Sequence, residues 1–154
     1  MSLSHRVAIA LGSNLGDRRA HLNHAVSRLR VLLTGVIASS FVETEPVGVG
    51  PQAKFLNAAV VGETAAPPQA LLARLREIEA ERGRERPHPG APRTLDLDLI
   101  LYGDAVIDQP DLVIPHPRFR DREFVLAPLA ELAPDLLDPV TKLTVGELLA
   151  RITR

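Results

Sequence analysis

Cysteine and tryptophan are both absent from this chain of 154 residues. Without cysteine there is no disulfide, no thiolate metal site and no cysteine nucleophile. Aromatic residues make up only 3%, so few rings can stack on nucleic-acid bases, and a formal net charge of −1 provides no basic field to attract them. No apolar run approaches the length of a membrane span, and the first residues lack the layout of a signal peptide. We therefore expect a cytoplasmic protein that binds neither nucleic acid nor a membrane.

The composition that is present is that of an ordinary globular domain. Hydrophobic residues make up 45% and charged residues 24%, and the length suits a single domain over residues 1–154. Apolar periodicity predicts the order strand, helix, strand, strand, helix, strand. This order is typical of an α/β (α+β) fold of the ferredoxin-like kind, a βαββαβ core in which helices pack on a mostly antiparallel sheet.

The expected elements have recognisable boundaries. The first helix starts at the N-cap Asp17 and ends at Gly35, and the second runs from Pro67 to Gly83. The four strands are expected over residues 6–12, 36–44, 55–63 and 94–102. A short edge strand is expected over residues 105–107, and two further helices over residues 124–132 and 145–152.

The segment from Arg93 to Leu101, RTLDLDLIL, carries two aspartates within an apolar strand pattern. Successive strand side chains point to opposite faces, so Asp96 and Asp98 share one face, about 7 Å apart, while Leu95, Leu97 and Leu99 share the other. Burying two unpaired carboxylates is costly, and a cation relieves that cost. Carboxylates on a rigid strand suit Mg²⁺, which shares its other positions with phosphates and water. The alternative is a strand whose solvated face happens to carry two aspartates.

Arginines are concentrated in two segments. Arg84 and Arg86 follow the second helix, and Arg93 enters the strand of the two aspartates. Because the guanidinium fork is suited to phosphate, this loop suggests a clamp that closes over a Mg²⁺-nucleotide. The segment 116–124, HPRFRDREF, adds a histidine and three arginines as a second wall. In the alternative, the arginines are solvated and pair with nearby glutamates, and residues 116–124 form a surface turn with Asp121 as the N-cap of a helix.

Phe55 and Asn57 share one face of the third strand, close in sequence to Thr44 and Val47. A ring beside an amide suits a flat heterocycle, because the ring can stack on it and the amide can read its edge. The alternative for Phe55 is an ordinary core position. The segment 12–17, GSNLGD, lacks both the Lys-Ser/Thr of a Walker motif and dinucleotide-fingerprint spacing, so we interpret it mainly as a strand–helix turn.

The motifs occur in an order found in a known enzyme family: GSNLGDR, ETEPVG, FLNAAV, GRER, PRTLDLDLILYG and VIPHPRFRDREFVLAPL. On these motifs, which span roughly residues 7–139, the chain resembles the 6-hydroxymethyl-7,8-dihydropterin pyrophosphokinases of the folate pathway. That family transfers pyrophosphate from ATP to the pterin hydroxymethyl group and releases AMP, in a ferredoxin-like fold. The resemblance therefore implies a Mg-dependent transferase of tetrahydrofolate biosynthesis that acts on two small molecules, ATP and the pterin. We expect the protein to be a monomer.

The resemblance also implies roles for particular residues. The catalytic group would comprise Arg84, Arg93, Asp96 and Asp98, the two aspartates holding two Mg²⁺ ions. The nucleotide would be bound by Glu79, Arg84, Arg86, Leu99, His116 and Arg122, with Leu99 near the adenine. The pterin would be bound by Thr44, Val47, Phe55, Asn57 and Phe124, with the two phenylalanine rings on either side of it.

One loop departs from the family pattern. Members usually carry Arg-Trp-Gly-Pro-Arg before Thr-Leu-Asp, whereas this chain has PGAPR at residues 89–93, without the tryptophan and one arginine. In the family that loop closes over both substrates, and such closure often sets turnover. The alternative function is therefore a pterin- and nucleotide-binding protein with lost or weak transfer activity.

Overall fold

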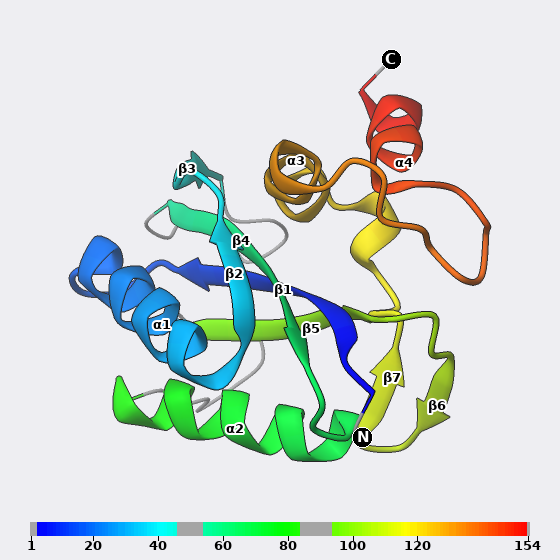
Figure 1. Cartoon of the computed structure of the whole chain (residues 1–154). Helices are drawn as coiled ribbons and strands as arrows, with labels where there is room; N and C mark the ends of the chain where they lie inside the picture. The colour runs from blue at the N-terminus through cyan, green and yellow to red at the C-terminus, as the bar shows by residue number, and fades with distance from the viewer. Residues whose placement is uncertain (1–2, 46–53, 84–93, 154) are drawn as a thin grey trace.

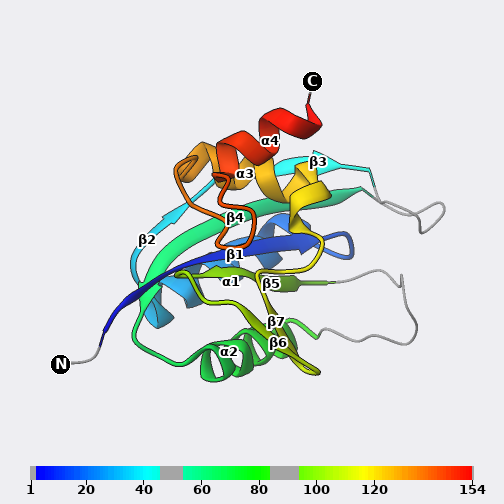
Figure 2. The same cartoon turned by 90° about the vertical axis from the view of Figure 1, so that its right-hand side faces the viewer.

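A computed structural model describes residues 3–45, 54–83 and 94–153 of the chain. The main strands are β1 (His5–Ser13), β2 (Thr34–Ala38), β3 (Val42–Thr44), β4 (Phe55–Thr64) and β5 (Asp96–Tyr102). They form an antiparallel sheet in the order β2-β4-β1-β5, with β3 also paired to β4 (Figures 1 and 2). The predicted ferredoxin-like, mostly antiparallel sheet is confirmed.

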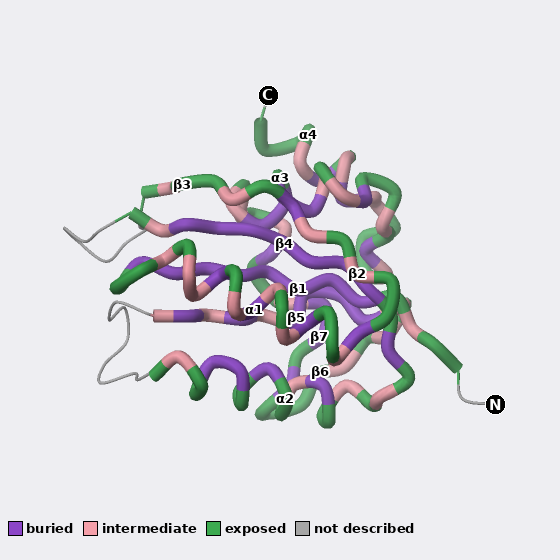
Figure 3. The backbone as a smooth tube through the Cα atoms, turned by 60° about the vertical axis from the view of Figure 1, so that its left-hand side comes forward, coloured by how far each residue is buried: buried purple, intermediate pink, exposed green. Residues whose placement is uncertain are grey.

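Helices lie on both faces of this sheet (Figure 2). α1 (Arg18–Leu32) and α2 (Pro68–Glu81) enclose a first core on one face, as the sequence order predicts. α3 (Glu123–Leu132) and α4 (Val145–Ile152) enclose a second core on the other face. The molecule is therefore a three-layer sandwich, and β1 and β4 run through its buried middle (Figure 3).

The alternating pattern of β1 separates the two cores. Val7, Ile9 and Leu11 belong to the core under α1 and α2, whereas Ala8 and Ala10 face the α3 side. Successive strand residues point to opposite faces, so a run of buried apolar residues feeds both layers. In β5, Leu101 lies in the second core, beyond an irregularity in the pairing with β1. Leu97 and Leu99, with Leu95 just before the strand, all lie in the first core. The expectation that these leucines share a face is confirmed.

The sequence predicts the start of α1 correctly but not its end. The Asp17 carboxylate accepts a hydrogen bond of 3.1 Å from the N–H of Ala20, which confirms Asp17 as the N-cap. The expected end at Gly35 is wrong, because the helix stops at Leu32 and Gly35 lies inside β2 with a φ of 60°.

The single strand expected over residues 36–44 is divided into β2 and β3. At the division Ser39 still pairs with β4: its N–H donates to the Ala59 carbonyl, and its hydroxyl accepts from the Ala59 N–H at 2.8 Å. Ser40 turns away and bonds Glu131 of α3 through both its N–H and its hydroxyl. The side chain of Ser39 thus takes the place of a backbone group and bends the strand.

The second half of the chain adds a small hairpin. β6 (Ile107–Gln109) pairs with β7 (Leu112–Ile114) in a separate two-stranded sheet, so the expected edge strand over 105–107 is shifted and does not join the main sheet. Asp121 lies in a 3-10 turn, η1 (Phe119–Asp121), and the N-cap of α3 is Arg122. The helices expected over residues 124–132 and 145–152 are confirmed. Within the described part of the chain, no helix is both long and apolar enough to cross a membrane.

Candidate active site

Asp96 and Asp98 lie on β5, opposite Gly12 and Ala10 of β1, with their carboxylates on the face that carries α3. Both side chains are half-buried. Burial, together with the neighbouring charges of Asp96 and Glu79, raises the pKa of Asp98 to about 7, although Arg76 and Arg122 act in the opposite direction. The ionised pair is therefore unfavourable as it stands, and a bound cation would relieve the repulsion.

The backbone between the two aspartates is held by two side chains of α2. The Glu79 carboxylate accepts a 2.8 Å hydrogen bond from the N–H of Leu97, and Arg76 donates one of 2.9 Å to the Leu97 carbonyl. Arg76 and Glu79 also pair with each other at 2.8 Å. β5 is the edge of the main sheet, so these side chains satisfy backbone groups that would otherwise lie open.

Glu79 is 4% exposed, and burial raises its pKa, although the Leu97 N–H and Arg76 counter that effect. Glu79 is expected among the nucleotide-binding residues, and in the structure its carboxylate contacts the backbone of the acidic strand. Arg76 is absent from the predicted site. The signal that could have found it is its spacing, because Arg76 lies one helical turn before Glu79 and the two side chains meet.

His116 lies beside β5, because its backbone N–H donates to the Ile100 carbonyl at 3.0 Å. Its Nδ1 accepts a hydrogen bond of 3.2 Å from the N–H of Arg118, which assigns the ring proton to Nε2. Burial lowers the pKa of His116, as do the charges of Arg122 and Arg118, whereas Asp96 raises it. The histidine therefore presents a neutral Nε2–H donor near the carboxylate pair.

Arg122 links this group to an aromatic ring. Its guanidinium carbon lies 5.5 Å from the centroid of the Phe124 ring, and its charge lowers the pKa of both Asp98 and His116. Phe124 is partly buried against the core of the α3 face. The predicted residues Asp96, Asp98, His116 and Arg122 are thus brought into one electrostatic neighbourhood, and Phe124 adjoins it.

Three of the predicted pterin residues, Thr44, Phe55 and Asn57, meet at the β3 end of β4. Thr44 pairs with Phe55 across the two strands, and the Asn57 amide donates a hydrogen bond to the Thr44 hydroxyl. Gly12 of β1 pairs with Asn57, and a Cβ at Gly12 would lie 3.2 Å from the Asn57 amide oxygen and 3.6 Å from the Phe55 ring. Gly12, which the sequence predicts at the junction of the first strand and a turn, therefore keeps this surface open.

Several predicted residues lie elsewhere. The Leu99 side chain is packed in the core under α1 and α2, on the face away from the carboxylates, so any approach to adenine would have to come from its backbone. Val47, Arg84, Arg86 and Arg93 lie outside the described residues. Over residues 3–45, 54–83 and 94–153, no group of three or more His, Asp or Glu side chains is arranged to hold a metal ion. A cation at Asp96 and Asp98 would need the rest of its ligands from phosphate and water.

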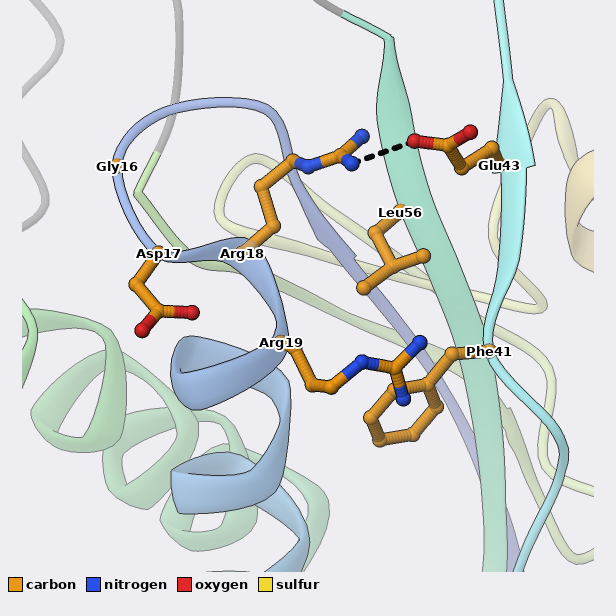
Figure 4. Close-up of a pocket in the computed structure, with 7 residues that line it drawn as sticks. All are labelled: Gly16, Asp17, Arg18, Arg19, Phe41, Glu43 and Leu56. Carbon is orange, nitrogen blue, oxygen red and sulfur yellow. Dashed lines mark hydrogen bonds and ion pairs between the residues drawn. The ribbon is translucent and has the colours of Figure 1, made fainter.

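A pocket of about 440 Å³ lies on the opposite face of β4. The pocket lies between the start of α1 and the strands β3 and β4 (Figure 4). The residues that line it are Gly16, Asp17, Arg18, Arg19, Phe41, Glu43 and Leu56. None of these residues belongs to the predicted site. Leu56 belongs to the core under α1 and α2, so the pocket and the Asn57 surface are separated by the sheet.

A ferredoxin-like sheet that presents paired carboxylates, an arginine and a neutral histidine on one face defines a class: a candidate transferase of phosphoryl-type groups. Comparison with known proteins narrows this class. The model of the 7,8-dihydro-6-hydroxymethylpterin-pyrophosphokinase family matches residues 8–134. The chain belongs to this family.

Relatives support the assignment. The chain is 48% identical over 126 residues to the 2-amino-4-hydroxy-6-hydroxymethyldihydropteridine pyrophosphokinase of Bacillus subtilis, covering 80% of this chain and 75% of that protein. It is 42% identical over 136 residues to the protein of the same name from Pseudomonas aeruginosa, covering 87% of this chain and 84% of that protein.

Solved structures share the fold. The wild-type HPPK-DHPS of Plasmodium falciparum matches with a TM-score of 0.76 at 16% identity, over 98% of this chain and 45% of that chain. The chain thus spans less than half of that longer protein, and the likeness shows a common fold.

Proposed function

We propose that the chain carries out the reaction of its family through the residues of the α3 face: transfer of pyrophosphate from ATP to the hydroxymethyl group of 6-hydroxymethyl-7,8-dihydropterin. The hydroxyl oxygen attacks the β-phosphorus, the bond between that phosphorus and the bridging oxygen breaks, and AMP leaves. The hydroxyl loses its proton, and no described side chain is an obvious base for it. The observation that carries the assignment is the half-buried pair Asp96 and Asp98 beside His116 and Arg122.

The carboxylate pair fits Mg²⁺. Its donors are hard oxygens on one face of a strand, and burial together with mutual repulsion leaves Asp98 with a pKa of about 7, so a cation is favoured there. We propose that Asp96 and Asp98 hold two Mg²⁺ ions. Bound there, they would neutralise charge on the transferred phosphates. The backbone clamp on Leu97 by Arg76 and Glu79 keeps both carboxylates on the same face.

The nucleotide would lie along β5 and the start of α3. The neutral His116 would donate its Nε2–H to a phosphate or ribose oxygen, and Arg122 would contribute positive charge. We extend this proposal to Arg84, Arg86 and Arg93 as phosphate ligands, with Arg84 and Arg93 in the catalytic group. Phosphoryl-type transfer needs positioning and charge neutralisation more than covalent chemistry, which suits such a residue set.

The pterin would lie on the surface opened by Gly12. Phe55 and Phe124 would flank the ring, and Asn57 would read its edge while Thr44 fixes the Asn57 amide. Val47 completes the proposed pterin set. We also propose that the chain acts as a monomeric, cytoplasmic domain over residues 1–154 with small molecules as its partners.

A product assay tests the proposal. The protein is incubated with ATP, Mg²⁺ and 6-hydroxymethyl-7,8-dihydropterin, and AMP is separated from ADP. AMP that depends on the pterin and equals the pterin diphosphate in amount supports pyrophosphoryl transfer. ADP contradicts the reaction class. Absence of AMP while both ligands bind would favour the binding protein with lost activity.

A further inference from the structure

Arg18, the first residue of α1, connects two strands that carry the proposed pterin site. One guanidinium nitrogen donates to the carbonyl of Lys54 at 2.8 Å. The other pairs with the carboxylate of Glu43, as Figure 4 shows. Glu43 is the middle residue of β3, and Lys54 directly precedes β4. A single side chain thus fastens β3 and the start of β4 to α1.

The contact lies behind the proposed pterin surface. Glu43 pairs with Leu56, whose side chain is in the core under α1 and α2, so Glu43 faces that side of the sheet. Thr44 is the next residue and therefore faces the other side, where its hydroxyl accepts the hydrogen bond of Asn57. Arg18 and the Asn57 amide are thus connected through two adjacent residues of one strand.

β3 has few other means of staying in place. It contains three residues, and its only strand partner in the described chain is β4. A strand this short at a sheet edge is weakly held by its ladder alone. A contact from α1 that uses two separate guanidinium donors adds both charge and fixed geometry.

The local sequence points to the same conclusion. The first turn of α1 contains no acidic residue and begins with Arg18 and Arg19. Cations at a helix N-terminus interact unfavourably with the helix dipole, so these two arginines do not stabilise α1. Arg19 packs over the Phe41 ring at 5.3 Å, and Arg18 has the contacts described above. Their position at the start of α1 is explained by these contacts with residues outside the helix.

We infer that Arg18 is a positioning residue for pterin recognition: through Glu43 and Lys54 it holds Thr44, and thereby Asn57, from the opposite face of the sheet. The inference rests on the proposed function, because it takes Asn57 as the group that reads the pterin. It adds a residue from the pocket on the α1 side, which makes no contact with the substrate itself.

Kinetics with Arg18→Met test this role. Methionine keeps much of the length but has no donor or charge. We expect the KM for the pterin to rise by roughly tenfold, equivalent to about 1.4 kcal/mol, while the KM for ATP stays within about twofold. Arg18→Lys keeps the charge but loses the planar guanidinium group, so its KM for the pterin should lie between those of the wild type and Arg18→Met. If Arg18→Met does not fold, Arg18→Lys replaces it in the test. Equal changes in both KM values, or none, would overturn the inference.

Arg28→Met is the matched control. Arg28 is on the same helix, is exposed to a similar extent and pairs at 3.0 Å with Glu81 of α2, away from β3. It should leave the KM for the pterin unchanged. If Arg28→Met raises that KM as much as Arg18→Met does, the effect is a general loss of helix packing and the inference fails.

A double-mutant cycle tests whether Arg18 affects pterin binding through Thr44. If Arg18 acts through Thr44, Arg18→Met should weaken pterin binding much less in a Thr44→Val background than in the native one. Full additivity of the two changes would contradict the route. Binding is followed by pterin fluorescence, since the chain has no tryptophan.

One readout does not need turnover or pterin. In ¹⁵N-labelled protein, Arg18→Met should shift the side-chain amide resonances of Asn57, whereas Arg28→Met should not. If the wild-type protein forms no AMP but the Asn57 resonances shift, the proposed function fails and the positioning contact stands. Unshifted Asn57 resonances overturn the positioning role whatever the enzyme produces.

Discussion

The Glu79 carboxylate accepts a hydrogen bond of 2.8 Å from the backbone N–H of Leu97, the residue between Asp96 and Asp98. Arg76 bonds the carbonyl of the same residue at 2.9 Å. Among the described residues, β5 has a neighbouring strand of the main sheet on one side only, and α2 supplies these two side chains on the other. An edge strand that carries a pair of mutually repelling carboxylates is therefore held in register by a helix.

Replacing Glu79 should lower the stability of the folded protein, because the hydrogen bond to the Leu97 N–H is lost. Glu79→Ala leaves a buried N–H without a partner, so we expect the free energy of unfolding to fall by about 2–3 kcal/mol. Glu79→Gln retains an oxygen acceptor and should lose about half as much. Urea unfolding of both variants measures the difference. Two variants that are as stable as the wild type would show that the contact contributes nothing.

Asp98→Asn should make the protein more stable at alkaline pH. The pKa of Asp98, raised by burial and by Asp96 from 3.8 to about 7, means that the folded state binds this proton more tightly than the unfolded state. The ionised carboxylate therefore lowers stability above about pH 7, and that effect fades as the pH falls toward 4. We expect Asp98→Asn to raise the free energy of unfolding by roughly 2 kcal/mol at pH 8 and by little at pH 4.

The measurement is denaturant unfolding at both pH values with a chelator present. Asp108→Asn, at an exposed carboxylate of β6, is the control and should change little at either pH. A destabilised Asp98→Asn variant at pH 8 would contradict the stated cause of the raised pKa.

Asp138 should show the opposite dependence on pH. It is fully buried, and although burial acts to raise its pKa, hydrogen bonds from Arg120, Thr141 and the N–H of Val140 lower the pKa to about 2. Its contribution to stability is therefore complete above its ordinary pKa of 3.8 and is lost as the pH falls through 2.

Asp138→Asn should accordingly lower the free energy of unfolding by about 2 kcal/mol at pH 7. The gap to the wild type should narrow as the pH falls from about 4 to about 2, which denaturant unfolding at several pH values can follow. If the difference in free energy of unfolding between the two proteins stays constant across this range, the ionised carboxylate of Asp138 is not the source of the stabilisation.

Phe124→Ala should weaken pterin binding more than ATP binding. The ring adjoins Arg122 and is partly buried on the α3 face, where we propose that it flanks the pterin. Loss of a stacking ring should raise the pterin Kd by about tenfold or more. Fluorescence titration measures the pterin Kd and calorimetry the ATP Kd. An unchanged pterin Kd contradicts the flanking position, and Phe124→Leu distinguishes stacking from plain packing.

Much of the fold follows from patterns that act over a few residues. The alternation of β1, the N-cap at Asp17 and the spacing of apolar residues in α2 predict the element order, and the order predicts the sheet. The division of the strand at Ser39 could not be predicted, because it depends on a hydroxyl bonding Ala59 of a distant strand.

The candidate site also contains residues that the sequence predicts and residues that only the fold brings together. Asp96 and Asp98 are visible in sequence because carboxylates interrupt an apolar strand. Arg76 has the sequence context of an ordinary exposed helix arginine, and only the fold places Leu97 beside it. Gly12 is predicted at the junction of a strand and a turn, and only the fold places Asn57 opposite it. Leu99 was assigned by resemblance, and its burial in the opposite core depends on the alternation of the strand.

The most direct test is pterin-dependent AMP formation by Asp96→Asn and Asp98→Asn, with Asp108→Asn as the control. Both site variants should fold, as circular dichroism can verify, and lose at least about 10³-fold in the rate of AMP release, because the bound cations neutralise charge in the transfer. Asp108→Asn should retain the wild-type rate. Near-wild-type AMP formation by either site variant would contradict the assignment of Asp96 and Asp98 as the cation site on which the account depends.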